Sequence, residues 1–114
     1  MDDQEQFAEN IRQAGKSIAR AEYELAGAEA ELKKMVALTM VRAEARGHKT
    51  HAKQSRTADE DCDVYQCRLD VGTAKGKLVA AKSNLAAAEV EFKVWQSTMA
   101  NLRFEKNRIY NHQG

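Results

Sequence analysis

The chain has 114 residues, a formal net charge of +1 and 31% charged residues. This length predicts one domain, and the nearly balanced charge excludes a global electrostatic attraction to nucleic acid or to a membrane surface. Proline is absent and aromatic residues make up only 6% of the chain, which is a composition typical of long helices.

The first residues, from Asp2 to Gln6, are polar and acidic. They predict no signal peptide, and they suit a helix N-terminus, where exposed amides favour negative charge. The longest apolar run, residues 35–41, is interrupted by Thr39 and is far too short to cross a bilayer. Two cysteines, neither near a terminus, favour free thiols, with a single disulfide as the alternative. We therefore expect a cytoplasmic protein that does not associate with membranes.

An apolar ladder with a spacing of three and four residues begins at Phe7 and predicts a helix over residues 3–46. Between Ile11 and Leu32 every second member is an alanine, and Gly47 is the expected C-terminal stop of the helix. The ladder consists of Phe7, Ile11, Ala14, Ile18, Ala21, Leu25, Ala28, Leu32 and Met35.

A second ladder of the same kind predicts another helix, over residues 58–109. Alanines again alternate with larger residues along most of it. Its members are Val64, Cys67, Val71, Ala74, Leu78, Ala81, Leu85, Ala88, Phe92, Trp95, Met99 and Leu102.

Pairing the two ladders in antiparallel sets a large residue against an alanine in each layer. We therefore predict an all-α fold, a long antiparallel two-helix hairpin that forms an alanine-rich coiled coil. Two registers, one heptad apart, keep this match, and they pair Ile18 with Ala81 or with Ala88. The second register also places Glu31 opposite Lys77. The first register places Glu31 opposite a second acid, Asp70, so the flanking charges favour the second register.

The segment between the helices, residues 47–57, is predicted to be the tip of a single hairpin domain that covers residues 1–114. Thr57 and Glu60 have the spacing of a capping box that opens the second helix. Thr50 is an alternative cap, because residues 51–56 contain no helix breaker.

The segment 42–56, which contains most of the tip, is strongly basic, with Glu44 as its one acid. Such a tip could contact the phosphate backbone of nucleic acid, dock an acidic protein, or be an ordinary solvated loop. Four acids follow within residues 59–63, and they would repel phosphate groups. They therefore argue against a nucleic-acid duplex that lies further along the helices. The candidate residues are Arg42, Arg46, His48, Lys49, His51, Lys53 and Arg56.

A two-helix hairpin buries only one stripe of each helix, and this chain carries further apolar and small residues outside that stripe. Glycine inside a helix costs about 1 kcal/mol relative to alanine, a cost that close approach of another helix would justify. We therefore predict a homodimer that forms a four-helix bundle. The alternatives are glycines that are merely tolerated, or a hairpin that opens into a domain-swapped dimer. The predicted self-association residues are Val36, Met40, Val41, Gly72, Gly76, Val79, Ala80, Ser83 and Ala87.

Three residues near the C-terminus, Phe104, Arg108 and Tyr110, lie outside the ladder in the most aromatic part of the chain. Exposed aromatics beside arginine are typical of binding hot spots, so these residues are a candidate contact with a protein partner. Equally, they could close the open end of the bundle against Phe7.

No catalytic motif is present, so we predict a protein that is not an enzyme and has neither a cofactor nor a small-molecule substrate. His48, His51, Cys62 and Cys67 are residue types that bind zinc. However, two cysteines five positions apart on one helix lie on different faces, and Cys67 fills a ladder position as a small core residue. We predict no metal.

Several short runs resemble small all-helical proteins that bacteriophages encode. They are Val-Arg-Ala-Glu at 41–44, Gly-His-Lys-Thr at 47–50, Ala-Lys-Gly at 74–76 and Glu-Val-Glu-Phe at 89–92, followed by Trp95, Met99-Ala100 and Leu102-Arg103. Such proteins are accessory factors of phage recombination or replication, or inhibitors of host enzymes. The resemblance covers residues 41–103 and brings no catalytic residues. It implies a bacterial cytoplasm and a partner that is a host or phage nucleic-acid-processing protein, with direct DNA or RNA binding through the tip as the alternative.

Overall fold

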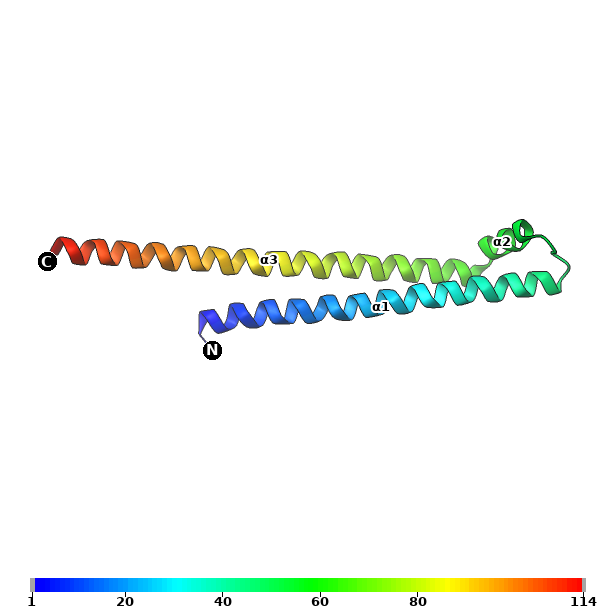
Figure 1. Ribbon diagram of the computed structural model, residues 1–114, viewed down its shortest axis with the longest axis horizontal. Helices are drawn as coiled ribbons and strands as arrows, with labels where there is room; N and C mark the ends of the chain where they lie inside the picture. Colours follow the sequence, from blue (N-terminus) through cyan, green and yellow to red (C-terminus); the bar gives the residue numbers. More distant parts are fainter. Residues whose placement is uncertain (1, 114) are drawn as a thin grey trace. The chain divides into compact units, whose positions relative to one another are not determined.

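The structure is a computed structural model that describes residues 2–113 (Figure 1). Helix α1 spans Asp3–Ala45, α2 spans His51–Glu60 and α3 spans Cys62–Gln113. No strand occurs among residues 2–113, which confirms the predicted all-α class. Over the same residues, no helix has an apolar stretch long enough to cross a membrane.

The chain divides into two compact units, and α1 and α3 contribute to both. The first unit combines Met1–Ser17 with Ala81–Gly114, and the second is Ile18–Ala80.

The first unit is centred on three aromatic rings. The ring centroid of Phe7 in α1 lies 5.6 Å from that of Trp95 and 6.1 Å from that of Phe92, both in α3. Further predicted ladder members are half-buried here: Ile11, Ala14, Leu85, Ala88 and Met99. Leu102, the last member of the predicted ladder, is instead 53% exposed, so the prediction that it is a core residue is wrong.

The second unit contains most of the fully buried residues. Val64 of α3 is completely buried. Thr39 is buried as well, and its hydroxyl donates a hydrogen bond of 2.8 Å to the carbonyl oxygen of Met35, so no polar atom is left unpaired there. The buried residues of this unit are Ala21, Thr39, Ala43, Ala58, Val64, Cys67, Val71 and Ala74, most of them predicted ladder members.

The register of α1 against α3 in this unit differs from the favoured one. The ammonium nitrogen of Lys77 lies 3.7 Å from a carboxylate oxygen of Glu24, not of Glu31, which is one heptad away. The favoured register is therefore wrong in this unit. Burial of the alanine ladder depends on the seven-residue period, which both registers share, whereas exposed ion pairs are too weak to choose between them.

Gly47 ends α1, as its sequence position predicts, with a φ of 102°. The amide of His48 donates to the carbonyl of Ala43, and the amide of Gly47 donates to that of Glu44, both at 3.0 Å. These bonds form a Schellman motif, which requires a left-handed residue that glycine adopts without strain.

The predicted tip, residues 47–57, is wrong in its second half, because α2 begins at His51. Thr50 is its N-cap and accepts a hydrogen bond from the amide of Lys53. The hydroxyl of Thr57 donates to the Lys53 carbonyl inside α2, so Thr57 does not cap a helix. Instead, Asp61 opens α3, because its carboxylate accepts from the amides of Asp63 (2.9 Å) and Val64 (3.0 Å).

Candidate functional site

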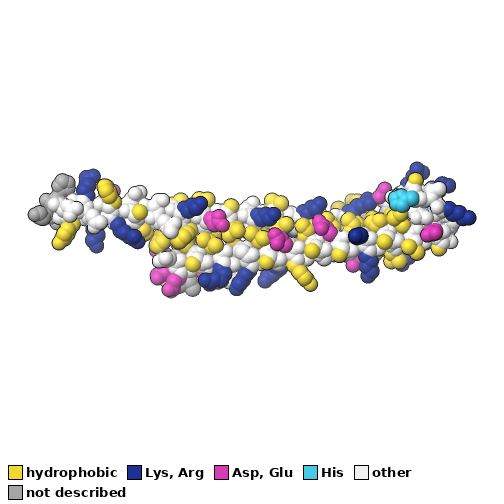
Figure 2. Space-filling view, in the orientation of Figure 1, with side chains coloured by type: hydrophobic (Ala, Val, Ile, Leu, Met, Phe, Trp, Pro, Cys, Tyr) yellow, Lys and Arg dark blue, Asp and Glu magenta, His cyan; other side chains and the backbone are white. Residues whose placement is uncertain are grey.

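The basic residues at the tip are all exposed, and they lie at the end of α1, in the turn that follows it and on the short helix α2. Figure 2 shows lysine and arginine side chains gathered there beside a histidine. The side-chain amide of Gln54 donates a 2.9 Å hydrogen bond to the His48 carbonyl, which ties α2 to the turn before it. The exposed set is the predicted one: Arg42, Arg46, His48, Lys49, His51, Lys53 and Arg56.

Three of these residues line one surface pocket of about 290 Å³: His48, Lys53 and Arg56. Thr57 and Glu60 complete its wall, so one acid faces the three basic groups. Arg42, Arg46, Lys49 and His51 are not part of this pocket. The structure thus brings together three of the seven predicted basic residues, because α2 returns Lys53, Arg56 and Thr57 toward the turn at His48.

The acidic run after the tip is partly neutralised inside the second unit. A guanidinium nitrogen of Arg68 lies 2.6 Å from a carboxylate oxygen of Asp59, and both side chains are largely exposed. Exposed pairs of this kind contribute only about 0–1 kcal/mol. The pair therefore orients α2 against α3 only weakly, and it partly neutralises the charge of Asp59.

The predicted self-association residues divide into two groups. Val36 and Met40 are half-buried within the second unit, which leaves less of their surface for another chain. The others are exposed: Val41, Gly72, Gly76, Val79, Ala80, Ser83 and Ala87.

Five exposed residues of α3 in the second unit form a stripe with three-and-four spacing, which we call the glycine face: Tyr65, Leu69, Gly72, Gly76 and Val79. None of them is charged. A Cβ atom built on Gly72 or Gly76 meets no atom within 4 Å, so no contact inside the chain explains either glycine. Val79 is 64% exposed. The stripe lies on the face of α3 opposite the buried ladder.

The predicted C-terminal contact residues are also exposed. Phe104 and Tyr110 are 68% and 77% exposed, and Arg108 lies between them. Phe7 packs instead on Phe92 and Trp95. The alternative in which Phe104 and Tyr110 close the bundle against Phe7 is therefore wrong for this chain by itself.

Sequence reasoning missed an apolar groove beside these rings. It has a volume of about 410 Å³ and is lined by Phe7, Val90, Glu91, Val94 and Trp95. Phe7 and Trp95 were predicted as core because of their ladder positions. The sequence signal for the groove was the pair Val90 and Val94. These two apolar residues are not ladder members, and their spacing of four positions places them on one side of α3.

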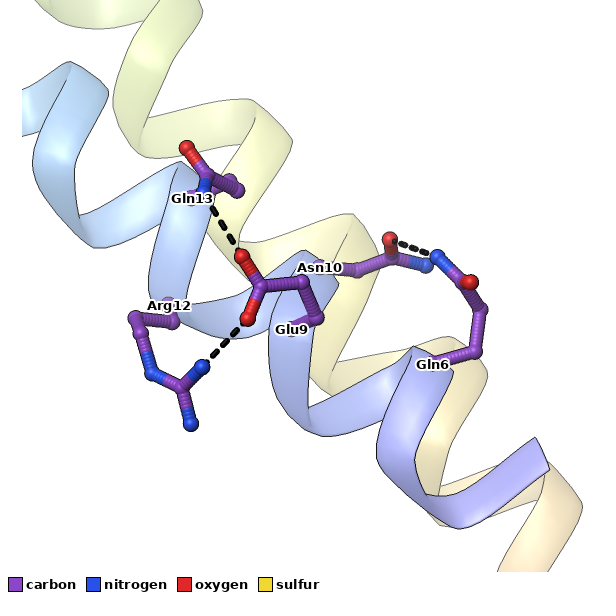
Figure 3. Close-up of polar contacts among 5 residues, drawn as sticks. All are labelled: Gln6, Glu9, Asn10, Arg12 and Gln13. Atoms are coloured by element: carbon purple, nitrogen blue, oxygen red, sulfur yellow. Dashed lines mark hydrogen bonds and ion pairs between the residues drawn. The ribbon is translucent and has the colours of Figure 1, made fainter. Parts of the chain in front are cut away.

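A local polar network covers the start of α1 (Figure 3). The carboxylate of Glu9 accepts a hydrogen bond of 2.6 Å from the Gln13 side chain and pairs with Arg12. The bond from Gln13, together with the positive charge of Arg12, lowers the pKa of Glu9 below its ordinary value. These contacts join residues three and four apart on one helix, so they support the helix and form no site.

The four residues of zinc-binding type, His48, His51, Cys62 and Cys67, are not gathered at one site in the part of the chain that the structure describes. Cys62 is exposed and Cys67 is buried. Among residues 2–113, no three histidine, cysteine or acidic side chains converge where a metal ion could bind. Burial raises the pKa of the Cys67 thiol, and the nearby charges of Glu31 and Asp70 add to the effect. A thiol in this environment is a core residue rather than a nucleophile.

No protein-family model matches the chain, and comparison with curated proteins and with solved structures found no similar protein.

Proposed function

We propose that this chain is a non-enzymatic, homo-oligomeric helical interaction module, built as one antiparallel helical hairpin. Two contacts support the hairpin: Phe7 packs on Phe92 in one unit, and Glu24 meets Lys77 in the other. Phe7, near the start of α1, meets Phe92, whereas Glu24, later in α1, meets Lys77, which is earlier in α3. Contacts that run in opposite directions along the two helices are what an antiparallel pair requires.

The single observation that carries the proposal is the glycine face. Leu69 and Val79 leave much of their apolar surface in water on either side of the two glycines. Gly72 and Gly76 each cost the helix about 1 kcal/mol relative to alanine and gain nothing from a neighbour inside the chain. Packing of a second helix across the glycines would bury Leu69 and Val79 and bring the two backbones close together. We propose that this second helix is α3 of another copy, which gives a four-helix bundle.

Replacing both glycines by leucine tests this contact. Nothing lies within 4 Å of either Cβ position, so the variant Gly72→Leu/Gly76→Leu keeps its fold, and its helix propensity improves. The two leucines hold a second helix away. We therefore expect the dimer dissociation constant, measured by sedimentation equilibrium, to rise at least tenfold, which corresponds to about 1.4 kcal/mol.

Gly27→Leu is the matched control. Gly27 is also exposed, helical and free of neighbours within 4 Å, but it lies on α1. The control should leave the dissociation constant unchanged. A double variant that dimerises as tightly as the wild type would refute the glycine face as the contact.

The partner that such a module serves is proposed from the resemblance to phage-encoded helical proteins. We propose a host or phage nucleic-acid-processing protein in a bacterial cytoplasm. Binding of the purified chain to candidate nucleases and recombinases would test this. A partner that binds the wild type but not a variant with altered surface residues would identify the binding face.

A second candidate function is direct nucleic-acid binding at the tip, favoured by the pocket that gathers His48, Lys53 and Arg56. Replacing Arg46, Lys49, Lys53 and Arg56 together by glutamate should then abolish binding to a short DNA duplex or single strand. Wild-type affinity should also fall steeply with salt, because phosphate contacts release counterions. Binding that survives the four substitutions would exclude this function.

A further inference from the structure

The pocket at the tip, which we call the tip pocket, takes four of its five lining residues from one face of α2. These four are Lys53, Arg56, Thr57 and Glu60. The last three follow the first by three, four and seven positions, which is the spacing of a single helical face. His48 closes the pocket from the turn between α1 and α2. The tip pocket therefore joins a helix face to a turn that lies before it in the sequence.

Contacts within the chain hold these two sides together. The side-chain amide of Gln54 donates a hydrogen bond of 2.9 Å to the His48 carbonyl, which joins α2 to the turn. Ala58, which is only 1% exposed, anchors α2 in the core of the second unit. The backbone that carries the three basic side chains is thus ordered before a ligand binds, and this reduces the entropy that binding costs.

The basic groups of the tip pocket are suited to an oxyanion. The guanidinium of Arg56 presents a planar fork of donors that matches phosphate, and the ammonium of Lys53 adds a compact positive charge. The imidazole of His48 has at least one N–H to donate in either charge state. No ion pair joins Glu60 to Lys53 or Arg56 in the part of the chain that the structure describes, so both cations are free to meet a ligand.

The charge of the tip pocket favours a phosphomonoester over a singly charged anion. Its wall carries the two positive charges of Lys53 and Arg56 and the one negative charge of Glu60, which leaves a net charge of +1. Protonation of His48 raises the net charge to +2. A phosphomonoester carries a charge of about −1.5 to −2 at neutral pH, whereas each phosphate inside a nucleic-acid strand carries about −1. The monoester therefore gains more from this set of charges.

Size and the neighbouring acids limit the ligand to a small molecule. The volume of about 290 Å³ is just below the range of about 300–1,000 Å³ that is usual for small-molecule sites. A strand that continued past the pocket toward α3 would bring further phosphates against Asp61 and Asp63, whereas a single terminal phosphate meets only Glu60. We propose that the tip pocket binds the phosphate group of a small phosphomonoester. This goes beyond both proposed functions, because neither a second copy nor a nucleic-acid strand takes part.

An NMR titration of the full chain at low ionic strength tests the tip pocket. The probes are inorganic phosphate and a nucleoside 5′-monophosphate, and the same nucleoside without its phosphate is the negative control. We expect both probes to shift the amide signals of His48, Lys53 and Arg56 until they saturate, and the nucleoside to leave them unchanged. The variant Lys53→Gln/Arg56→Gln should weaken binding of the monophosphate about tenfold or more, because two charged donors are lost. Glu60→Gln should tighten it, because a like charge is removed.

Arg46→Gln/Lys49→Gln is the matched control. It also removes one arginine and one lysine from exposed positions of the tip, but neither residue lines the pocket. All four substituted side chains are exposed, so both variants keep the fold. The control should bind the monophosphate within about twofold of the wild-type affinity. If the control loses as much affinity as the pocket variant, the attraction comes from diffuse charge, and the inference is overturned.

The outcomes separate this inference from the proposed functions. If neither probe shifts the signals of the wild type, the tip pocket binds no phosphomonoester, whatever the oligomeric state of the chain. If an oligonucleotide binds at the tip while both small probes do not, nucleic-acid binding stands and the inference is overturned.

Discussion

The ammonium nitrogen of Lys77 lies 3.7 Å from a carboxylate oxygen of Glu24, and this contact joins α1 to α3 in the second unit. A double-mutant cycle with Glu24→Gln and Lys77→Met should give a coupling free energy of about 0.2–1 kcal/mol in low salt, as expected for exposed pairs. Urea unfolding would measure it. The same cycle with Glu31→Gln should give none, and coupling of Lys77 to Glu31 instead would contradict the register described.

The cap residues make a second prediction. Asp61→Ala removes the acceptor for two amides at the start of α3, so it should lower the free energy of unfolding by about 1 kcal/mol. Thr50→Ala removes the N-cap of α2 and should lower the free energy of unfolding by a similar amount. Thr57→Ala is the control, and its effect should stay within about 0.5 kcal/mol, because Thr57 caps no helix. A larger loss at Thr57 than at Asp61 would show that α3 begins earlier.

Two glycines should respond to alanine with opposite signs. Gly47 has a φ of 102°, so Gly47→Ala should destabilise the protein by about 1 kcal/mol. Gly15 is helical, exposed and free of close neighbours, so Gly15→Ala should stabilise the protein by about 0.5–1 kcal/mol. Thermal and urea unfolding would measure both. Equal effects of the same sign would mean that Gly47 does not hold the left-handed conformation.

The two thiols should differ in reactivity. Cys62 is exposed, whereas Cys67 is buried and has a raised pKa, so less of Cys67 is thiolate at any given pH. Iodoacetamide at neutral pH should therefore alkylate Cys62 first, as followed by mass spectrometry, and both thiols equally in urea. Labelling of Cys67 should need a higher pH than labelling of an ordinary thiol, because burial raises its pKa. Asp70→Asn should lower that pH, because it removes a nearby negative charge. Equal rates in the folded protein would place Cys67 outside the core.

The seven-residue period of the apolar ladders was enough to predict the helices and much of the core. Val64, Cys67, Val71 and Ala74 are all buried as their spacing requires. Register could not be predicted, because a shift of one heptad preserves every large-to-small match. Leu102 fits the ladder yet is exposed, since the period cannot show where the partner helix ends.

The break between α2 and α3 was beyond sequence reasoning for a different reason. No glycine or proline marks it, and the aspartates around Asp61 fit either a helix or a cap. The choice is made by tertiary packing, which buries Ala58 and Val64 on either side of the break. For the candidate site, exposure of the basic tip and of the glycines was predictable from their positions off the ladder. The pocket at His48 depends on α2 and was not.

Self-association through the glycine face is the central claim, and the molar mass of the purified protein in solution tests it most directly. Light scattering, with and without a short DNA, should give at least the mass of a dimer and no change on adding DNA. Introduction of Gly72→Leu/Gly76→Leu should lower that mass. A wild-type protein that stays monomeric at all concentrations and shifts only when DNA is added would contradict the claim and favour the basic tip as the functional surface.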